Sequence, residues 1–385
     1  MPVMSCGNTS AEGGAGRVVR PLYPASRIHM EAMTTTIGLW QHARGSEPDP
    51  RFGYCTDDVA RSIIVDVLQS RELGWAAVDA DVRRSLRFLQ DAFRRTSGRF
   101  LNFRSAEGEM LAMGASEDCH ARALAGLACL VAEIPDTELA AESWRLFLRA
   151  LPAARSFGAL RAISAALLAC DSIVGKCPSL EVTSAFEVLA TRLAAMFGKP
   201  AEDWPWPDEV LTYENFIVPH ALIVAGRRLD RPELMALGCR VLDWLVDVQI
   251  GESGVFSPIG TEAWWRRSER KSPFDQQPIE AGSLVSAAAD AFRITGEGRY
   301  RVAAEMAYGW FLGDNDLGVT LADPTRGSCH DGLTPAGCNT NQGAESTLMW
   351  LTALEQIREL RRSANGGAQP RSPAGGNIQS RRAGG

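Results

Sequence analysis

The sequence predicts an all-α fold, an (α/α)6 toroid of twelve helices. Six buried helices would form an inner ring, and six amphipathic helices would surround it. Residues from about 26 to 362 read as one helix after another, with only two short strand-like pieces at 99–104 and 254–258. The helices alternate between segments that are apolar on all faces and segments with one polar face. Their spacing is irregular, which favours a closed ring with long loops over a solenoid of fixed repeat.

The second helical segment shows the buried type. Val59, Ile63 and Val67 belong to a run that is apolar nearly all round, and such a helix must be buried. The fourth, sixth and tenth segments share this character. The twelve predicted segments are 26–44, 56–73, 77–96, 117–133, 137–151, 157–174, 180–198, 212–228, 231–250, 278–296, 298–314 and 342–362.

The third segment shows the other type. Arg83 and Arg87 lie on one side of it, whereas Leu86 and Leu89 suit the opposite side. This stripe of apolar residues at helical spacing predicts a helix that covers a core with one face. The ninth segment repeats the pattern. Together the two types predict an inner ring within an outer ring.

The composition sets the limits on class and location. The chain has 385 residues, 45% of them hydrophobic, a net charge of −6 and a pI near 5.6. We expect one catalytic domain over residues 21–362, between disordered tails at 1–20 and 363–385. The acidic balance argues against nucleic acid as a partner. No run is long enough to span a membrane, and no signal peptide is evident, so a cytoplasmic protein is expected.

Nine cysteines are scattered along the chain without a CxxC pair. An odd number of this kind, partly within apolar runs, indicates reduced and mostly buried thiols. Cys119–His120 and Cys329–His330 are adjacent pairs, but neighbouring residues seldom face one ion. We therefore expect neither a metal nor a cofactor.

Acidic and amide residues mark the starts of five of the six predicted inner helices, and the start near 157 is the exception. In an inner ring these starts meet at one mouth, where burial and mutual repulsion would separate the pKa values of the carboxyl groups. A glycosidase needs that separation between its acid and its base or nucleophile. The candidate acids and bases are Asp58, Glu117, Glu280 and Glu345. The candidates for binding hydroxyl groups are Asp57, Asp118, Glu214, Asn215, Asn339, Asn341 and Gln342. For any single helix, the alternative is an ordinary N-terminal cap.

Aromatic and histidine side chains add further candidates. Trp204 and Trp206 precede the eighth segment, and Trp264 precedes the tenth. Tryptophans in loops can stack on a sugar ring, with core filling as the alternative. His120 lies one turn into the fourth segment, and His330 precedes the last one. Either would contribute to the mouth or, alternatively, serve a structural role.

Three stretches carry a resemblance to known families: residues 38–43 (GLWQHA), 53–58 (GYCTDD) and 341–347 (NQGAEST). Over residues 26 to 360 the chain resembles six-hairpin glycosidases and, more distantly, the N-acylglucosamine 2-epimerase group. It is more closely similar to a bacterial glycosidase-like family that is often labelled glycosyltransferase and is associated with mannoside processing. The resemblance implies a toroid and a saccharide ligand. The chain shows no βαβ run or Gly-rich phosphate loop of the kind a nucleotide-sugar transferase normally needs.

The leading hypothesis is a glycoside hydrolase for short oligosaccharides, mannose-containing ones among them. A sugar epimerase or isomerase with His120 or His330 as base is the second. A phosphorylase that holds phosphate with Arg266 or Arg267 is a third. The fourth is a non-catalytic saccharide-binding partner of a glycan enzyme. The sequence leaves the choice of acid and base, the linkage and the oligomeric state open.

Overall fold

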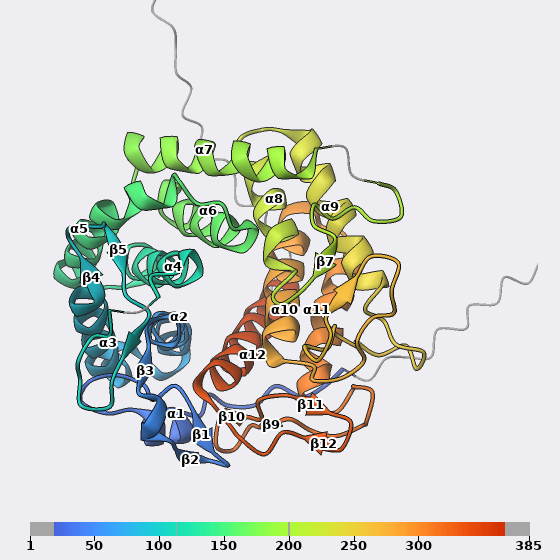
Figure 1. Cartoon of the computed structure of the whole chain (residues 1–385), viewed down its shortest axis with the longest axis horizontal. Coiled ribbons are helices and arrows are strands. Elements are labelled where there is room, and N and C mark those ends of the chain that lie inside the picture. Colours follow the sequence, from blue (N-terminus) through green and yellow to red (C-terminus); the bar gives the residue numbers. More distant parts are fainter. Residues whose placement is uncertain (1–18, 113, 199–200, 366–385) are drawn as a thin grey trace, which may run out of the picture.

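The computed structural model describes residues 19–112, 114–198 and 201–365. Within this part of the chain, twelve α-helices form a ring within a ring, which confirms the predicted fold class (Figure 1). Each inner helix packs on the next, and the last packs on the first, so the inner ring is closed. The inner helices are α2 (Thr56–Leu73), α4 (Glu117–Glu133), α6 (Leu160–Val174), α8 (Ile217–Arg228), α10 (Pro278–Thr295) and α12 (Ala344–Asn365).

Five of the outer helices each follow an inner one and run back along it. The sixth outer place, beside α12, holds only the six-residue α1. The outer helices are α1 (Ile28–Met33), α3 (Asp79–Ala92), α5 (Thr137–Ala154), α7 (Leu180–Phe197), α9 (Pro232–Asp247) and α11 (Gly298–Phe311).

Short strands pair two by two in the loops. The pairs are β1 (Ala43–Arg44) with β2 (Glu47–Pro48), β3 (Tyr54–Cys55) with β6 (Phe103–Arg104), β4 (Phe93–Arg94) with β5 (Arg99–Phe100), β7 (Val210–Leu211) with β8 (Trp265–Arg266), β9 (Ala322–Asp323) with β10 (Ser328–Cys329), and β11 (Leu333–Thr334) with β12 (Gly337–Cys338). Two 3-10 turns, Pro50–Phe52 and Trp75–Ala77, complete the described elements. The predicted strand at 99–104 therefore divides between β5 and β6. The one predicted at 254–258 is reduced to a single bridge between Ile250 and Phe256.

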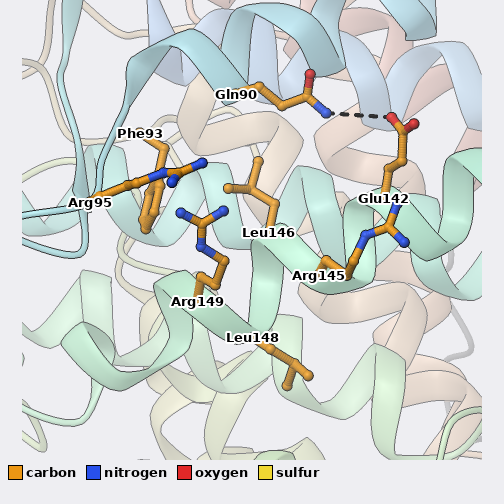
Figure 2. Close-up of a pocket in the computed structure, with 8 residues that line it drawn as sticks. All are labelled: Gln90, Phe93, Arg95, Glu142, Arg145, Leu146, Leu148 and Arg149. Carbon is orange, nitrogen blue, oxygen red and sulfur yellow. Dashed lines mark hydrogen bonds between the residues drawn. The ribbon is translucent and has the colours of Figure 1, made fainter.

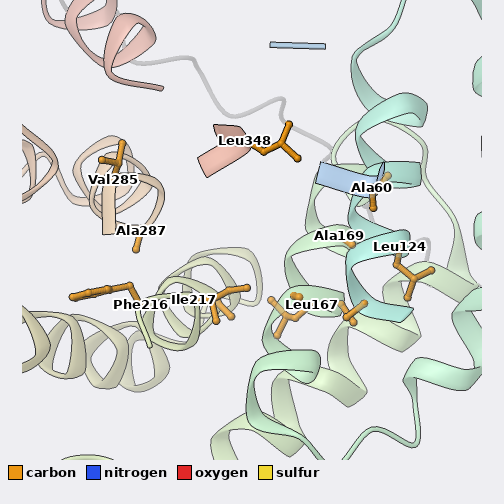
Figure 3. Close-up of a cluster of buried hydrophobic side chains, with 14 of the residues drawn as sticks. Ala60, Leu124, Leu167, Ala169, Phe216, Ile217, Val285, Ala287 and Leu348 are labelled. Carbon is orange, nitrogen blue, oxygen red and sulfur yellow. The ribbon is translucent and has the colours of Figure 1, made fainter. Parts of the chain in front are cut away.

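The core lies between the two rings, and buried side chains of the inner helices contribute much of it (Figure 3). Small residues let the inner helices approach closely. A Cβ on Gly126 of α4 would lie 2.9 Å from the carbonyl oxygen of Ala60 in α2. Alternation of fully and half-buried helices follows from this packing, because an inner helix has neighbours on every side. No helix in the described ranges is long and apolar enough to cross a membrane.

Several predicted boundaries differ from those of the structure. The first helix, predicted over 26–44, ends at Met33. The Thr34 hydroxyl caps the carbonyl of Met30, and its backbone is extended, so the run of threonines ends the helix. The eighth helix begins at Ile217 rather than 212. Of the predicted tails, Arg20 pairs with Asp314 and α12 continues to Asn365; the rest of both tails lies outside the described residues.

The loop that follows α9 doubles back tightly at Gly260. A Cβ on Gly260 would lie 1.6 Å from the carbonyl oxygen of Phe274, so Gly260→Ala must push the two chain segments apart. We expect a loss of ~1–3 kcal/mol in unfolding free energy from this overpacking, measured by urea denaturation. Gly158→Ala is the matched control, because a Cβ there meets nothing within 4 Å. Equal stability of the two variants would contradict the close approach.

Candidate active site

The inner helices begin at one end of the ring, and a cavity of about 390 Å³ lies there. Three carboxylates from three different helices reach it: Asp57 from α2, Asp118 from α4 and Glu345 from α12. We call it the mouth cavity. Its other lining residues are Arg61, Ser116, Arg122, Tyr213, Thr261, Trp264, Gln277 and Ile279.

Two arginines form the inner boundary of the mouth cavity, and both are paired with acids. The Arg61 guanidinium lies 3.1 Å from Asp58 Oδ1 and 3.0 Å from Glu345 Oε2. Arg122 pairs with Glu214. Glu345 is thus oriented by a charge from a neighbouring helix, and its carboxylate stays at the cavity wall.

A third arginine supports the wall from behind. Arg161 of α6 donates to Asn215 Oδ1 at 2.9 Å and to the carbonyl of Tyr213. Its guanidinium lies 4.5 Å from the centre of the Tyr213 ring. The Tyr213 hydroxyl in turn donates to Asp118. Arg161 therefore positions the Tyr213 side chain, whose hydroxyl group binds Asp118.

Burial sets the electrostatics behind the cavity. It raises the pKa of Asp58 to about 7, although the Arg61 charge acts in the opposite direction. It also raises the pKa of Glu280 to about 7, against the lowering effects of Arg161 and of hydrogen bonds from Asn215. Burial lowers the pKa of Arg122 to about 10, and the nearby Arg61 charge adds to this. These shifts indicate a poorly hydrated charge cluster beneath the mouth.

The raised pKa of Glu280 gives a pH-dependent stability. The folded state keeps the proton up to about pH 7, whereas the unfolded chain releases it near pH 4.3. Between these values the folded state binds more protons, so Glu280 contributes less stability as pH rises. Glu280→Gln removes this loss. The difference in unfolding free energy, variant minus parent, should therefore rise by a few kcal/mol between pH 4.5 and pH 7.5. Urea denaturation at both pH values measures it. A pH-independent difference would contradict the prediction.

Four of the predicted site residues line the mouth cavity: Asp57, Asp118, Trp264 and Glu345. Two candidate acids, Asp58 and Glu280, are 3% and 2% exposed and stand behind the wall. Glu214 and Asn215 are buried beside them. Asp58 and Glu280 are turned away from the cavity because side chains at successive helix positions point in different directions; Glu214 and Asn215 lie in the loop before α8.

Glu117 was predicted as a catalytic acid or base, but the structure points it elsewhere. Its Oε2 accepts hydrogen bonds of 2.8 Å from the backbone amides of Gly158 and Ala159. The carboxylate therefore caps the start of α6, which has no acid in its own first turn. This placement corrects the catalytic assignment.

The two tryptophans at 204 and 206 are also corrected. They are 5% and 3% exposed and belong to the core, where Trp204 packs edge-on against Trp244 and Trp265. An aromatic face enclosed in this way cannot stack on a sugar. Trp264 alone among the three predicted tryptophans reaches the mouth cavity.

His120 lies outside the cavity as well. It is fully buried, with Nε2 3.0 Å from the carbonyl of Ala150 and Nδ1 accepting from the Phe100 amide. Burial lowers its pKa to about 4. These contacts face the outer helix α5, so His120 cannot serve as a base at the mouth.

The stretch before α12 is tied down by its own contacts. Asn341 Oδ1 accepts from the amide of Gly45, and Gln342 O lies 2.8 Å from His29 Nε2. Asn339 accepts from the amide of Asn341. Neither these three residues nor His330 lines the mouth cavity, so their predicted role in ligand binding gains no support from it. The contacts of Asn339, Asn341 and the Gln342 backbone fix the loop that presents Glu345.

The residues missed by sequence reasoning are the arginines and the small polar side chains. Arg61 and Arg122 each follow the helix start by about one turn and were overlooked because an arginine in a helix is usually exposed. The signal that could have identified them is the position of each arginine within an otherwise apolar helix, which indicates a buried and paired charge. Tyr213, Thr261, Ser116 and Gln277 carried no comparable signal.

Strained backbone accompanies the site. Glu214 and Trp264 have φ of 49° and 57°, the left-handed region that bulky residues seldom adopt. Asp275, in the same loop as Trp264, has φ of 55°. Strain of this kind tends to gather where a structure must hold a side chain in one direction.

A second cavity of about 290 Å³ lies further along the ring axis. All six inner helices line it. Arg61 and Arg122 line both cavities, so two guanidinium groups separate the mouth from this inner space. His220 faces it, with Nε2 2.7 Å from Asp290 Oδ2.

Comparison with solved structures places the fold among sugar-processing toroids. A cellobiose 2-epimerase from Spirochaeta thermophila superposes with a TM-score of 0.66 at 15% identity, over 85% of this chain and 91% of that one. A D-mannose isomerase gives 0.65 at 11% identity, over 87% and 94%. A family 76 α-mannanase from Bacteroides thetaiotaomicron gives 0.59 at 8% identity, over 88% and 94%. No family model and no curated protein matches the sequence.

The class that these observations define is the six-hairpin (α/α)6 fold, which epimerases, isomerases and glycoside hydrolases share. At these identities the likeness concerns the fold alone. The reaction must therefore be argued from the residues of the mouth cavity.

Proposed function

We propose that this chain is a glycoside hydrolase that acts on short oligosaccharides, mannose-containing ones among them, in the mouth cavity. The observation that carries the proposal is the meeting of Asp57, Asp118 and Glu345 in one space of about 390 Å³. They come from three separate helices. Hydrolysis of a glycosidic bond by the usual route requires two carboxyl groups on opposite sides of the bond, and carboxylates from different walls can provide that arrangement.

The remaining lining suits a saccharide. Trp264 offers an aromatic surface for the apolar face of a sugar ring, and Thr261, Ser116 and Gln277 offer hydrogen bonds to hydroxyl groups. Two of the three carboxylates would serve as acid and as base or nucleophile, and the third would bind hydroxyls. Arg61 and Tyr213 position Glu345 and Asp118.

The function is tested by incubating the purified protein with a panel of manno- and gluco-oligosaccharides, with and without phosphate, and analysing products by mass spectrometry. Shorter saccharides carrying one added water are the expected products. Azide added to Asp57→Asn, Asp118→Asn and Glu345→Gln variants would then identify the base or nucleophile by restoring turnover. Tight binding with no turnover across the panel would instead favour a saccharide-binding partner.

A sugar epimerase or isomerase is the second candidate. It is supported by the TM-scores with an epimerase and an isomerase, which are higher than the TM-score with the α-mannanase. No histidine in the described residues lines the mouth cavity, so a carboxylate would have to abstract the proton. Incubation of free sugars in deuterated water separates the two candidates, because proton abstraction next to a carbonyl places deuterium on carbon.

A phosphorylase gains no support from the two arginines considered for phosphate. Arg267 binds Asp203 at 3.0 Å, and Arg266 lies 3.8 Å from Glu269. Neither lines the mouth cavity. Its lining carries three carboxylates against two arginines, a balance that does not favour an anion.

A further inference from the structure

A basic groove lies on the outside of the ring between α3 and α5, away from the mouth cavity (Figure 2). It measures about 730 Å³. Three arginines stand over it: Arg95 from the β4–β5 turn, and Arg145 and Arg149 from one face of α5. The other lining residues are Gln90, Phe93, Glu142, Leu146 and Leu148.

The positive charge of this basic groove is unbalanced. None of its three arginines forms an ion pair with a described residue, whereas Arg83 and Arg84 on the adjacent α3 are both paired with acids. The single acid, Glu142, accepts a hydrogen bond of 3.4 Å from Gln90. The groove is therefore cationic on a chain whose net charge is −6.

The floor of the groove is apolar. Leu146 and Phe93 are 6% and 9% exposed, and the half-buried Leu148 lines the groove from another side of α5. The Arg149 guanidinium lies 5.2 Å from the centre of the Phe93 ring, which fixes its position. It also covers the ring, so Phe93 is not available for stacking on a sugar.

We propose that the basic groove docks an acidic segment of a partner protein, one that alternates carboxylate and aliphatic side chains. Carboxylates would pair with the guanidinium groups, which suit them geometrically. An aliphatic side chain would cover Leu146. The chain's own ends do not fit: residues 366–385 contain three arginines and no acid, and residues 1–18 contain one of each charge.

The test uses the full-length protein and a fluorescent twelve-residue peptide of alternating Glu and Leu, followed by polarisation. The double variant Arg145→Glu/Arg149→Glu should weaken binding by at least about tenfold, and added salt should weaken the parent complex. The matched control reverses two exposed arginines on another part of the ring, Arg227→Glu/Arg240→Glu, and should bind as the parent does. Circular dichroism confirms that both variants are folded.

Three outcomes would overturn the proposal. One is equal weakening of peptide binding in the two double variants, which would indicate non-specific electrostatic attraction. Another is tighter binding of an acidic oligosaccharide of equal charge than of the peptide. The last is a dimer in sedimentation that only the Arg145→Glu/Arg149→Glu variant abolishes, since the occupant would then be a second copy. None of these depends on the mouth cavity or on hydrolysis.

Discussion

We propose Asp118 as one of the two reacting carboxyl groups, so Asp118→Asn should lower kcat on the substrate found in the saccharide screen by ~10²–10⁴-fold, the range expected when a general acid or base is lost. Asp118 lines the mouth cavity and receives a hydrogen bond from the Tyr213 hydroxyl. The amide keeps the shape but can neither give nor take the proton. Initial rates and the urea midpoint should be measured together, since the fold should be retained.

The neighbouring residue provides the control for this prediction. Glu117→Gln alters the adjacent position, whose carboxylate caps α6 rather than facing the cavity. It should lower stability by ~0.5–2 kcal/mol, as loss of a helix cap does, and leave kcat within about twofold because the change lies outside the reacting groups. The reverse pattern, with Glu117→Gln inactive and Asp118→Asn active, would contradict the assignment of the mouth cavity.

Arg61→Met should cost ~3–5 kcal/mol of unfolding free energy, because it leaves the buried Asp58 carboxylate without its partner. Arg61 lies between Asp58 and Glu345, both within 3.1 Å of its guanidinium. The double variant Asp58→Asn/Arg61→Met removes the stranded carboxylate and should recover part of the loss, a coupling that a double-mutant cycle measures. Urea denaturation at pH 8 is the suitable measurement, because Asp58 has a pKa of about 7.

Arg71→Met is the matched control on the same helix. Arg71 pairs with Glu359 at 2.7 Å and with Glu133 at 3.3 Å, but its side chain is 40% exposed. Ion pairs in water contribute little, so its loss should cost less than ~1 kcal/mol. If Arg61→Met costs no more than Arg71→Met, the buried charge layer beneath the mouth does not stabilise the fold.

Both predictions depend on which side of a helix a residue faces. Glu117 and Asp118 are neighbours in sequence, yet one caps α6 and the other lines the cavity. Successive residues diverge by about 100° around a helix axis. Acids at the starts of the inner helices therefore indicate at which end of the ring the cavity lies. The rotation of each helix about its own axis determines which of its side chains enters the cavity.

Local hydrophobic patterning was sufficient to predict the toroid. The alternation of wholly apolar and one-sided helices reports directly how many neighbours each helix has, so the inner and outer rings followed from residues such as Val59 and Ile63. The N-terminal polar clusters predicted that five inner-helix starts share one mouth, and Asp57, Asp118 and Glu345 from three of them line one cavity.

Only the tertiary structure decided which polar residues would stand behind the wall and which would line it. Arg61, Arg122 and Tyr213 gain their roles from partners more than forty positions away or on other helices. Trp204 packs against Trp244 and Trp265, and Trp206 packs against Phe197, contacts that no local pattern contains. Burial and charge pairing are properties of the assembled ring, so they became visible only when the helices were placed side by side.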